Sequence, residues 1–216
     1  MKPQNLSSTS SFLSICLAML FSISLPVASQ AQQINMDERI GDWMYIGGDV
    51  ASQRYSELSQ IDASNFGDLD ISWEWDGGSF GNVNARPTPI YVDGMLITVA
   101  GERRYVVALD AGTGETLWTF REPSTPRWEY SMRKNHGKGV AYANVDGRDI
   151  VLVVSPAFFL HALDAHTGQP IEGFGGAIPI EGFPETGTVD LLADLGHEYD
   201  VYEGIPLETG YITSSS

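Results

Sequence analysis

A short stretch of the chain gathers basic side chains that could bind an anion. Four cations and one histidine fall within twelve residues: Arg127, Arg133, Lys134, His136 and Lys138. The whole chain carries 12 Lys and Arg against 28 Asp and Glu, so a cationic segment stands out from its surroundings. Guanidinium and ammonium groups form strong, charge-assisted hydrogen bonds with carboxylates and phosphates. The segment therefore predicts a seat for a small polyanion, and a solvated basic loop is the alternative.

Two other groups of side chains have the chemistry of metal ligands. His161 and His166 lie close in sequence but lack a third ligand, so an ordinary strand or turn role is favoured over a metal site. Four acidic residues near the end offer the oxygen atoms that Ca²⁺ prefers: Asp190, Asp194, Glu198 and Asp200. No EF-hand or Gly-Gly-x-Gly-x-Asp loop frames them, which favours a solvated acidic loop.

A phrase that occurs twice indicates the elements that must position these side chains. The first copy runs from Ala108 to Trp118 and the second from Ala162 to Glu172, 54 residues later. Both copies contain Asp-x-x-Thr-Gly after an apolar run, a pattern that predicts a strand entering a tight turn. Self-similarity at roughly 40–50 residues is typical of β-propellers. Two unrelated hairpin turns are the alternative.

The remaining pattern predicts an all-β fold of short strands. We expect one hairpin over residues 88–99, folded at Asp93-Gly94, and another over residues 139–154, folded at Asp146-Gly147. Trp118 is large enough to pack against a neighbouring unit, whereas Glu172 stands at the same place in the second copy.

Two further segments carry weaker patterns. A strand is expected to begin at Leu69, with Ile71, Trp73 and Trp75 alternating to one face. From Gly173 onward the pattern loosens, and residues 189–204 are predicted to form an acidic excursion over the surface.

Residues 1–31 predict a secretory signal peptide. Lys2 is the only charge before Asp37, and a mostly apolar run precedes Ser29-Gln30-Ala31, whose small residues suit a signal peptidase. A permanent anchor needs about 20 apolar residues, and this run is shorter. Ile15 stands before Cys16 where a lipoprotein needs a small residue, which disfavours lipidation.

Removal of the signal would change the composition of the exported protein. Loss of Lys2 leaves 11 basic residues against 28 acidic ones, a net charge of −17. Nucleic acid and anionic membranes are then poor partners. The only cysteine, Cys16, is lost as well, so neither a disulfide nor a thiolate metal site is expected.

We expect residues 32–216 to be the N-terminal part of a β-propeller. Two repeat units do not close a ring that usually needs about 4–8 blades, so the segment is expected to be incomplete. A small open all-β domain, complete in itself, is the alternative.

Several blocks of this sequence resemble the pyrroloquinoline-quinone (PQQ) dependent dehydrogenases. The opening from Asp42-Trp43 through Arg54-Tyr55-Ser56 to Trp73 is similar to the start of that family, and residues 88–94 are similar to its first blade hairpin. The two Ala-x-Asp-x-x-Thr-Gly phrases resemble its blade-docking motif. Residues 139–142 and 173–175 resemble the membrane glucose dehydrogenase branch in particular.

The resemblance implies a periplasmic, eight-bladed propeller enzyme. It would oxidise an alcohol or an aldose sugar and pass electrons to a quinone or cytochrome acceptor, with PQQ and Ca²⁺ on the propeller axis. The Ca²⁺ ligands and the catalytic Asp are expected beyond Ser216, so no catalytic or metal residue is predicted here, and this chain alone is expected to be inactive. A non-catalytic repeat propeller that serves as an assembly or binding scaffold at the outer membrane is the alternative.

The resemblance also implies three cofactor-binding positions. Lys138 stands just before the Gly139-Val140-Ala141 block, where the family has an Arg on the quinone carboxylates, so the charge is kept and the bidentate fork is lost. Arg86 stands where the family usually has a Glu, and Thr213 resembles a Thr near the cofactor. Many alcohol dehydrogenases of the family carry two adjacent cysteines just before the position of Lys138; their absence argues against that branch.

Overall fold

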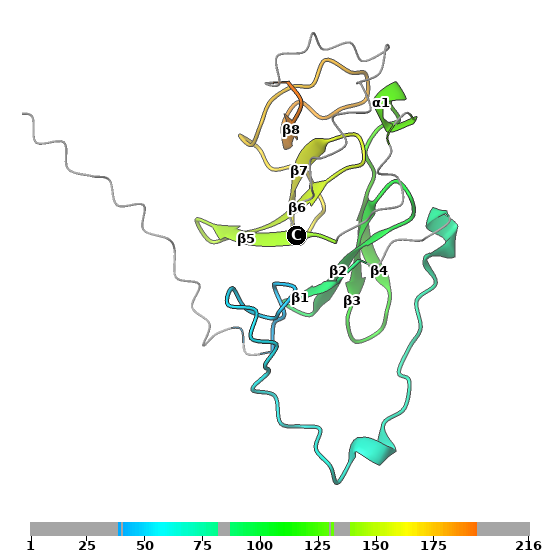
Figure 1. The fold of residues 1–216 in the computed structure, drawn as a ribbon, viewed down its shortest axis with the longest axis vertical. Helices are drawn as coiled ribbons and strands as arrows, with labels where there is room; N and C mark the ends of the chain where they lie inside the picture. The colour runs from blue at the N-terminus through cyan, green and yellow to red at the C-terminus, as the bar shows by residue number, and fades with distance from the viewer. Residues whose placement is uncertain (1–38, 40, 82–86, 130, 132–138, 194–216) are drawn as a thin grey trace, which may run out of the picture. The chain divides into compact units, whose positions relative to one another are not determined.

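The described part of the chain consists of two antiparallel β-sheets. A computed structural model describes residues 39, 41–81, 87–129, 131 and 139–193. The first four-stranded sheet has the order β1 (Ile90–Val92), β2 (Met95–Ala100), β3 (Tyr105–Asp110) and β4 (Thr116–Phe120). The second, also four-stranded, has the order β5 (Ala141–Val145), β6 (Arg148–Val154), β7 (Phe159–Asp164) and β8 (Thr188–Asp190) (Figure 1). The predicted all-β fold is confirmed.

Helical structure in the described ranges is limited to single turns. They are η2 (Phe66–Asp68), η3 (Gly77–Phe80) and α1 (Pro126–Glu129). Among the residues placed in the structure, no helix has the length and apolar character needed to cross a membrane.

Both Asp-Gly turns close hairpins as predicted. Val92 is paired with Met95, and Val145 with Arg148, which leaves two-residue loops at Asp93-Gly94 and Asp146-Gly147. The φ angles are 47° and 77° in the first loop and 53° and 78° in the second. Positive φ at both central positions is what a type I′ turn requires, and its twist matches that of the strands.

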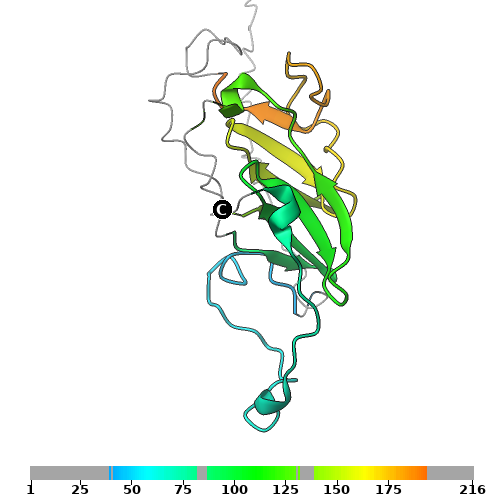
Figure 2. The same ribbon diagram turned by 90° about the vertical axis from the view of Figure 1, so that its right-hand side faces the viewer.

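The main core lies between the two sheets. Apolar side chains from the inner strands of both sheets, among them Ile97, Val106, Val151 and Leu163, form one buried cluster. Met44, from the segment before the first sheet, is buried in the same cluster. On its other face the first sheet packs Val107 and Leu109 against aromatic residues from 73–80. Figure 2 shows the two sheets in a view turned by 90° from that of Figure 1.

A tryptophan ring packs on the turn of each repeat phrase. Trp118 Nε1 donates a hydrogen bond of 3.0 Å to the carbonyl of Ala165, and a Cβ placed on Gly168 would come within 2.5 Å of the Trp118 ring. Trp73 makes the same 3.0 Å bond to Ala111 in the first phrase, over Gly114. Trp118 therefore packs between the two sheets as predicted, although its side chain is only half-buried.

The strand predicted from Leu69 does not form. Residues 69–76 have no regular secondary structure, and Leu69 and Ile71 are 53% and 77% exposed. Trp73 and Trp75 contact the first sheet through their rings, but no strand of the described ranges pairs with their backbone. Alternating side chains do not make a strand without a neighbour that satisfies its backbone N–H and C=O groups.

The expected excursion from residue 189 is also partly wrong. Thr188–Asp190 is β8, which pairs with β7 and completes the second sheet, and Leu192 is buried. Residues 172–187 run outside the sheet before they return to this outer strand. Glu172 therefore does not lie in a fourth strand, whereas the matching Trp118 lies within β4. Residues 194–204 lie outside the described ranges.

Candidate functional site

The three predicted cofactor-binding residues, Lys138, Arg86 and Thr213, lie outside the described residues. The flanks of two of them are described. Gly139, next to Lys138, lies against the backbone of Thr88, two residues after Arg86: a Cβ on Gly139 would come within 2.7 Å of the Thr88 carbonyl oxygen, and its φ is +86°. Only glycine adopts this conformation at such a close approach without strain. The structure thus brings together the flanks of two positions that the sequence places about fifty residues apart.

Arg127, the first cation of the predicted anion seat, is engaged elsewhere. Its guanidinium donates two hydrogen bonds of 2.9 Å to the carboxylate of Asp190 and one of 3.0 Å to the carbonyl of Ala157. It also lies 4.3 Å from the centre of the Phe159 ring. Because Arg127 is bound to Asp190, it does not belong to the predicted anion-binding site. This corrects the grouping of Arg127 with the other basic residues. It also shows that Asp190 is not part of a solvated acidic loop.

A second guanidinium lies near α1. Arg103, from the connection between β2 and β3, stacks 3.7 Å above the ring of Trp128. Its NH1 donates a 3.0 Å hydrogen bond to the hydroxyl of Ser124. Stacking on an indole is a favourable position for a guanidinium. This contact holds α1 against the β2–β3 connection.

A hydroxyl and an imidazole of the second sheet line up with a carboxylate from the segment that follows β4. His161 Nδ1 lies 3.1 Å from the Thr188 hydroxyl, and Nε2 lies 2.7 Å from the Glu122 carboxylate. The order of groups is that of a hydrolytic triad. However, the His161 and Thr188 residues are each only 1% exposed, so no substrate reaches the hydroxyl. The cluster is therefore structural, and His161 has a strand role in β7.

Asp149 is the centre of a second polar network, at the opposite end of the second sheet. It accepts hydrogen bonds of 2.6 Å from each of Arg39, Tyr142 and Asn144. His166 Nε2 lies 3.3 Å from the same carboxylate, on the turn of the second phrase. Burial by itself raises the pKa of Asp149, but these hydrogen bonds outweigh it and lower the pKa to about 2. The network ties the N-terminal segment to the second sheet.

Sequence reasoning missed this network. Tyr142 was noted only as part of a family block, and Arg39 carried no signal. The neighbouring Asp42 has a pKa raised by burial, and its Oδ2 lies 3.8 Å from an Arg39 nitrogen. Because Arg39 and Asp149 are 110 residues apart, no local pattern could have linked them.

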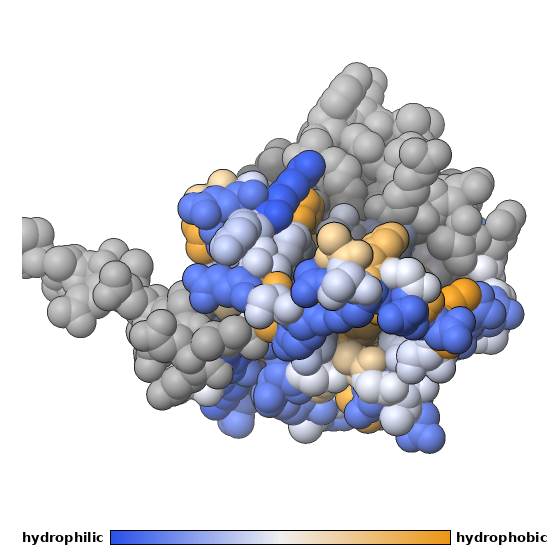
Figure 3. Space-filling model, turned by 90° about the horizontal axis from the view of Figure 1, so that it is seen from below, coloured by the Kyte–Doolittle hydropathy of each residue, from blue (hydrophilic) through white to orange (hydrophobic). Residues whose placement is uncertain are grey.

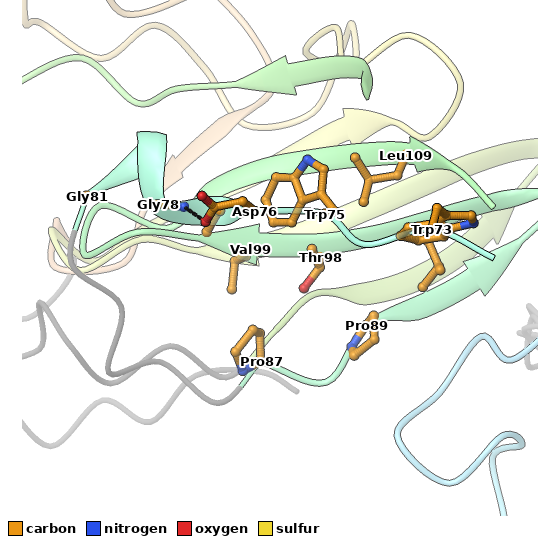
Figure 4. A pocket seen from close by; sticks show the side chains of 13 residues that line it. Trp73, Trp75, Asp76, Gly78, Gly81, Pro87, Pro89, Thr98, Val99 and Leu109 are labelled. Carbon is orange, nitrogen blue, oxygen red and sulfur yellow. Dashed lines mark hydrogen bonds between the residues drawn. The ribbon is translucent and has the colours of Figure 1, made fainter. Parts of the chain in front are cut away.

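Among the described residues no group of three or more His, Cys, Asp or Glu side chains is arranged to hold a metal ion. An apolar pocket of about 840 Å³ lies on the face of the first sheet that is turned away from the second. Figure 4 shows Trp73 and Trp75 on one side of it and Pro87 and Pro89 on the other. Its acid, Asp76, accepts a 2.8 Å hydrogen bond from the Gly78 backbone. The lining suits apolar contact rather than proton transfer.

Comparison with known proteins places the chain in a family. Residues 43–208 match the model of the PQQ glucose/ethanol/alcohol dehydrogenase β-propeller domain. The chain is 35% identical to the quinohemoprotein alcohol dehydrogenase of Comamonas testosteroni over 192 residues, which cover 82% of this chain and 24% of that protein. It is 31% identical to the dehydrogenase subunit of the quinone alcohol dehydrogenase of Gluconobacter oxydans, over 73% of this chain and 21% of that protein.

The solved structure of the Comamonas testosteroni enzyme matches 62% of this chain and 20% of its own, at 35% identity and a TM-score of 0.48. The chain thus spans about a quarter of the length of the curated relatives that it matches. These relatives are alcohol dehydrogenases, so the resemblance to the membrane glucose dehydrogenase branch is not supported. The missing cysteine pair did not exclude the alcohol branch. Because the family match covers more than half of its residues, the chain belongs to the PQQ glucose/ethanol/alcohol dehydrogenase β-propeller family.

Proposed function

We propose that this chain forms part of a PQQ-dependent dehydrogenase that oxidises an alcohol. Family membership over residues 43–208 carries the proposal. Relatives named alcohol dehydrogenase, at 31–35% identity, favour an alcohol over an aldose sugar as the substrate. The proposal concerns the protein at the length of these relatives.

The chain's own part in this function is to hold the cofactor. Bound PQQ supplies a quinone that accepts the two electrons removed from the alcohol. We assign Lys138 and Arg86 to its carboxylates and Thr213 to a hydrogen bond nearby. The approach of Gly139 to Thr88 supports the pairing of Lys138 and Arg86, because their flanking residues are in contact. Ammonium and guanidinium groups suit a ligand that carries several carboxylates.

The remaining parts of the proposal rest on sequence and on the relatives. The proposed electron acceptor is a quinone or a cytochrome, because one relative is named for a quinone and another for cytochrome c. The signal predicted over residues 1–31 supports a periplasmic location. Ca²⁺ is proposed beside the quinone, with ligands that the family resemblance puts beyond Ser216.

The test is reconstitution of the purified full-length apo-protein with PQQ and CaCl₂. We expect reduction of an artificial dye that depends on both PQQ and a primary alcohol, with glucose as the comparison substrate. Glucose-dependent turnover without alcohol-dependent turnover would overturn the choice of substrate. Failure to bind PQQ at all would overturn the function and favour a non-catalytic scaffold.

A single substitution tests the cofactor contact. Loss of a charge-assisted hydrogen bond costs about 1.5–3 kcal/mol, so Lys138→Ala should weaken PQQ binding roughly ten- to a hundredfold. Lys138→Arg should bind better than Lys138→Ala, because it keeps the charge. Arg148→Ala, which removes an exposed cation at the β5–β6 turn, is the control for net charge and should bind like the wild type. Equal Kd values for Lys138→Ala and the wild type would show that the quinone carboxylates are held elsewhere.

A further inference from the structure

The segment that connects the two sheets lies across one face of the second sheet. Residues 121–129, here called the strap, follow β4 and include α1. Figure 2 shows α1 beside β8, and the contacts of Arg127 with Asp190 join the two. Glu122, Thr125, Arg127 and Trp128 of the strap are buried. The strap is therefore part of the packed structure although it is largely without regular secondary structure.

The first contact between strap and sheet uses Glu122. Its carboxylate lies 2.7 Å from His161 Nε2, and the other ring nitrogen of His161 lies 3.1 Å from the Thr188 hydroxyl. His161 and Thr188 are cross-strand neighbours in the register of β7 and β8. The contact thus joins the strap to both strands. The side chains of Glu122 and His161 are 6% and 1% exposed.

The second contact repeats this arrangement two residues along the strands. Phe159 and Asp190 are also cross-strand neighbours of β7 and β8. Arg127 binds the Asp190 carboxylate through two hydrogen bonds of 2.9 Å and lies 4.3 Å from the centre of the Phe159 ring. Residues two apart in a strand point to the same face, so both contacts lie on one side of the sheet.

The Arg127–Asp190 contact places charged groups where burial is costly. A buried ion pair gains little net stability, because desolvation offsets its attraction, but removal of one partner leaves an uncompensated charge. The hydrogen bonds of these contacts depend on direction. Two such contacts therefore allow only one register of the strap on the sheet. A third bond follows two residues after the strap, where the Ser131 hydroxyl donates to the Pro156 carbonyl at 2.6 Å.

We propose that the Glu122–His161 and Arg127–Asp190 contacts are a positioning device for the cofactor site, so that PQQ affinity depends on the register of the strap on β7 and β8. This proposal rests on the proposed function, in which Lys138 binds PQQ. Lys138 follows Ser131 by seven residues in the sequence. Glu122, Arg127, His161 and Asp190 are positioning residues and do not contact the cofactor. Their effect is local to the strap, β7 and β8, whereas the main core between the two sheets lies elsewhere.

The test compares two buried carboxylates of the second sheet in the full-length protein. Asp190→Asn breaks the pair with Arg127, and Asp149→Asn breaks the pair with Arg39 at the other end of the sheet, where Asp149 Oδ2 lies 2.6 Å from NH2 of Arg39. Asp190→Glu keeps the charge. The readouts are the PQQ Kd, from quenching of tryptophan fluorescence, and hydrogen–deuterium exchange in peptides that cover residues 121–129 and 188–193.

We expect Asp190→Asn to raise the Kd for PQQ about tenfold or more and to speed exchange in both peptides. Asp190→Glu should restore most of the affinity. Asp149→Asn should lower the melting temperature but leave the Kd and the exchange of these peptides unchanged. An unchanged Kd in Asp190→Asn, or an equal loss in Asp149→Asn, would overturn the positioning role. If the wild type itself does not bind PQQ, the proposed function fails, and unchanged exchange in Asp190→Asn would then overturn the device independently.

Discussion

At the scale of single residues, burial and hydrogen bonding shift the pKa values of two carboxyl groups in opposite directions. Asp42 and Asp149 both lie near Arg39. Burial raises the pKa of Asp42 more than its hydrogen bond and Arg39 lower it. For Asp149 the balance is reversed, because Tyr142, Arg39 and Asn144 all donate to it. Tyr142 has its own pKa raised, by burial and by its hydrogen bond to Asp149.

Asp149 gives a prediction for acid stability. A carboxyl group whose pKa is lowered to about 2 in the folded state stabilises the fold above its unfolded pKa and loses that contribution as the pH falls towards 2. Asp149→Asn should therefore cost about 2 kcal/mol at pH 7, and the difference from the wild type should shrink between about pH 4 and pH 2. Urea unfolding at a series of pH values measures this. Asp70→Asn removes an exposed carboxylate as a control, and an equal pH dependence in both variants would contradict the assignment.

The sequence shows which residues are charged but not which of them meet. Arg127 was grouped with the basic residues that follow it, because only its neighbours in sequence are visible before folding. Its partner Asp190 lies 63 residues away. The contact between Gly139 and Thr88 was not predicted either, although the family blocks at both places were recognisable in the sequence. Lys138, Arg86 and Thr213 stay predictions.

At the scale of elements, local sequence signals were sufficient to predict a strand pair wherever the two strands are joined by one turn. The two Asp-Gly hairpins and the strand-to-turn phrases depend on φ and on side-chain hydrogen bonds within a few residues, and both are visible in sequence. The strand from Leu69 needs a partner that lies elsewhere, and β8 follows a detour over residues 172–187. Neither could be predicted from alternation alone.

The tryptophan on each Thr-Gly turn gives an element-scale prediction. Gly168 and Gly147 have φ angles of +69° and +78°, but only at Gly168 would a Cβ meet a ring, at 2.5 Å from Trp118. Gly147→Ala should cost about 1 kcal/mol for its backbone alone. Gly168→Ala should cost about 1–3 kcal/mol more, because the indole must move away from the Ala165 carbonyl. Urea midpoints and the tryptophan fluorescence spectrum of each variant measure this. Equal losses in the two variants would mean that Trp118 does not constrain the turn.

At the scale of the whole described structure, apolar surface gathers in two places outside the main core. One is the segment from 46 to 71, where eight large apolar side chains are 45–83% exposed: Ile46, Val50, Tyr55, Leu58, Ile61, Phe66, Leu69 and Ile71. Figure 3 shows hydrophobic residues in orange among hydrophilic ones in blue. The other is the pocket beside Trp73 and Trp75. The single apolar residues are ordinary, whereas a contiguous apolar pocket is typical of a binding or packing surface.

This pocket gives the last prediction. Because it has a volume of about 840 Å³ and is lined by Trp73, Trp75 and Leu96, the 216-residue chain should bind a hydrophobic dye such as ANS and self-associate at high concentration. Leu96→Thr suits a strand but removes apolar lining, so it should lower dye fluorescence and association, at a cost of about 1 kcal/mol in stability. Leu117→Thr changes an exposed leucine of β4 outside the pocket and is the matched control. Dye titration and light scattering after size exclusion measure both effects. A monomer without dye binding, or equal effects of the two substitutions, would show that this face of the first sheet is not an apolar packing surface.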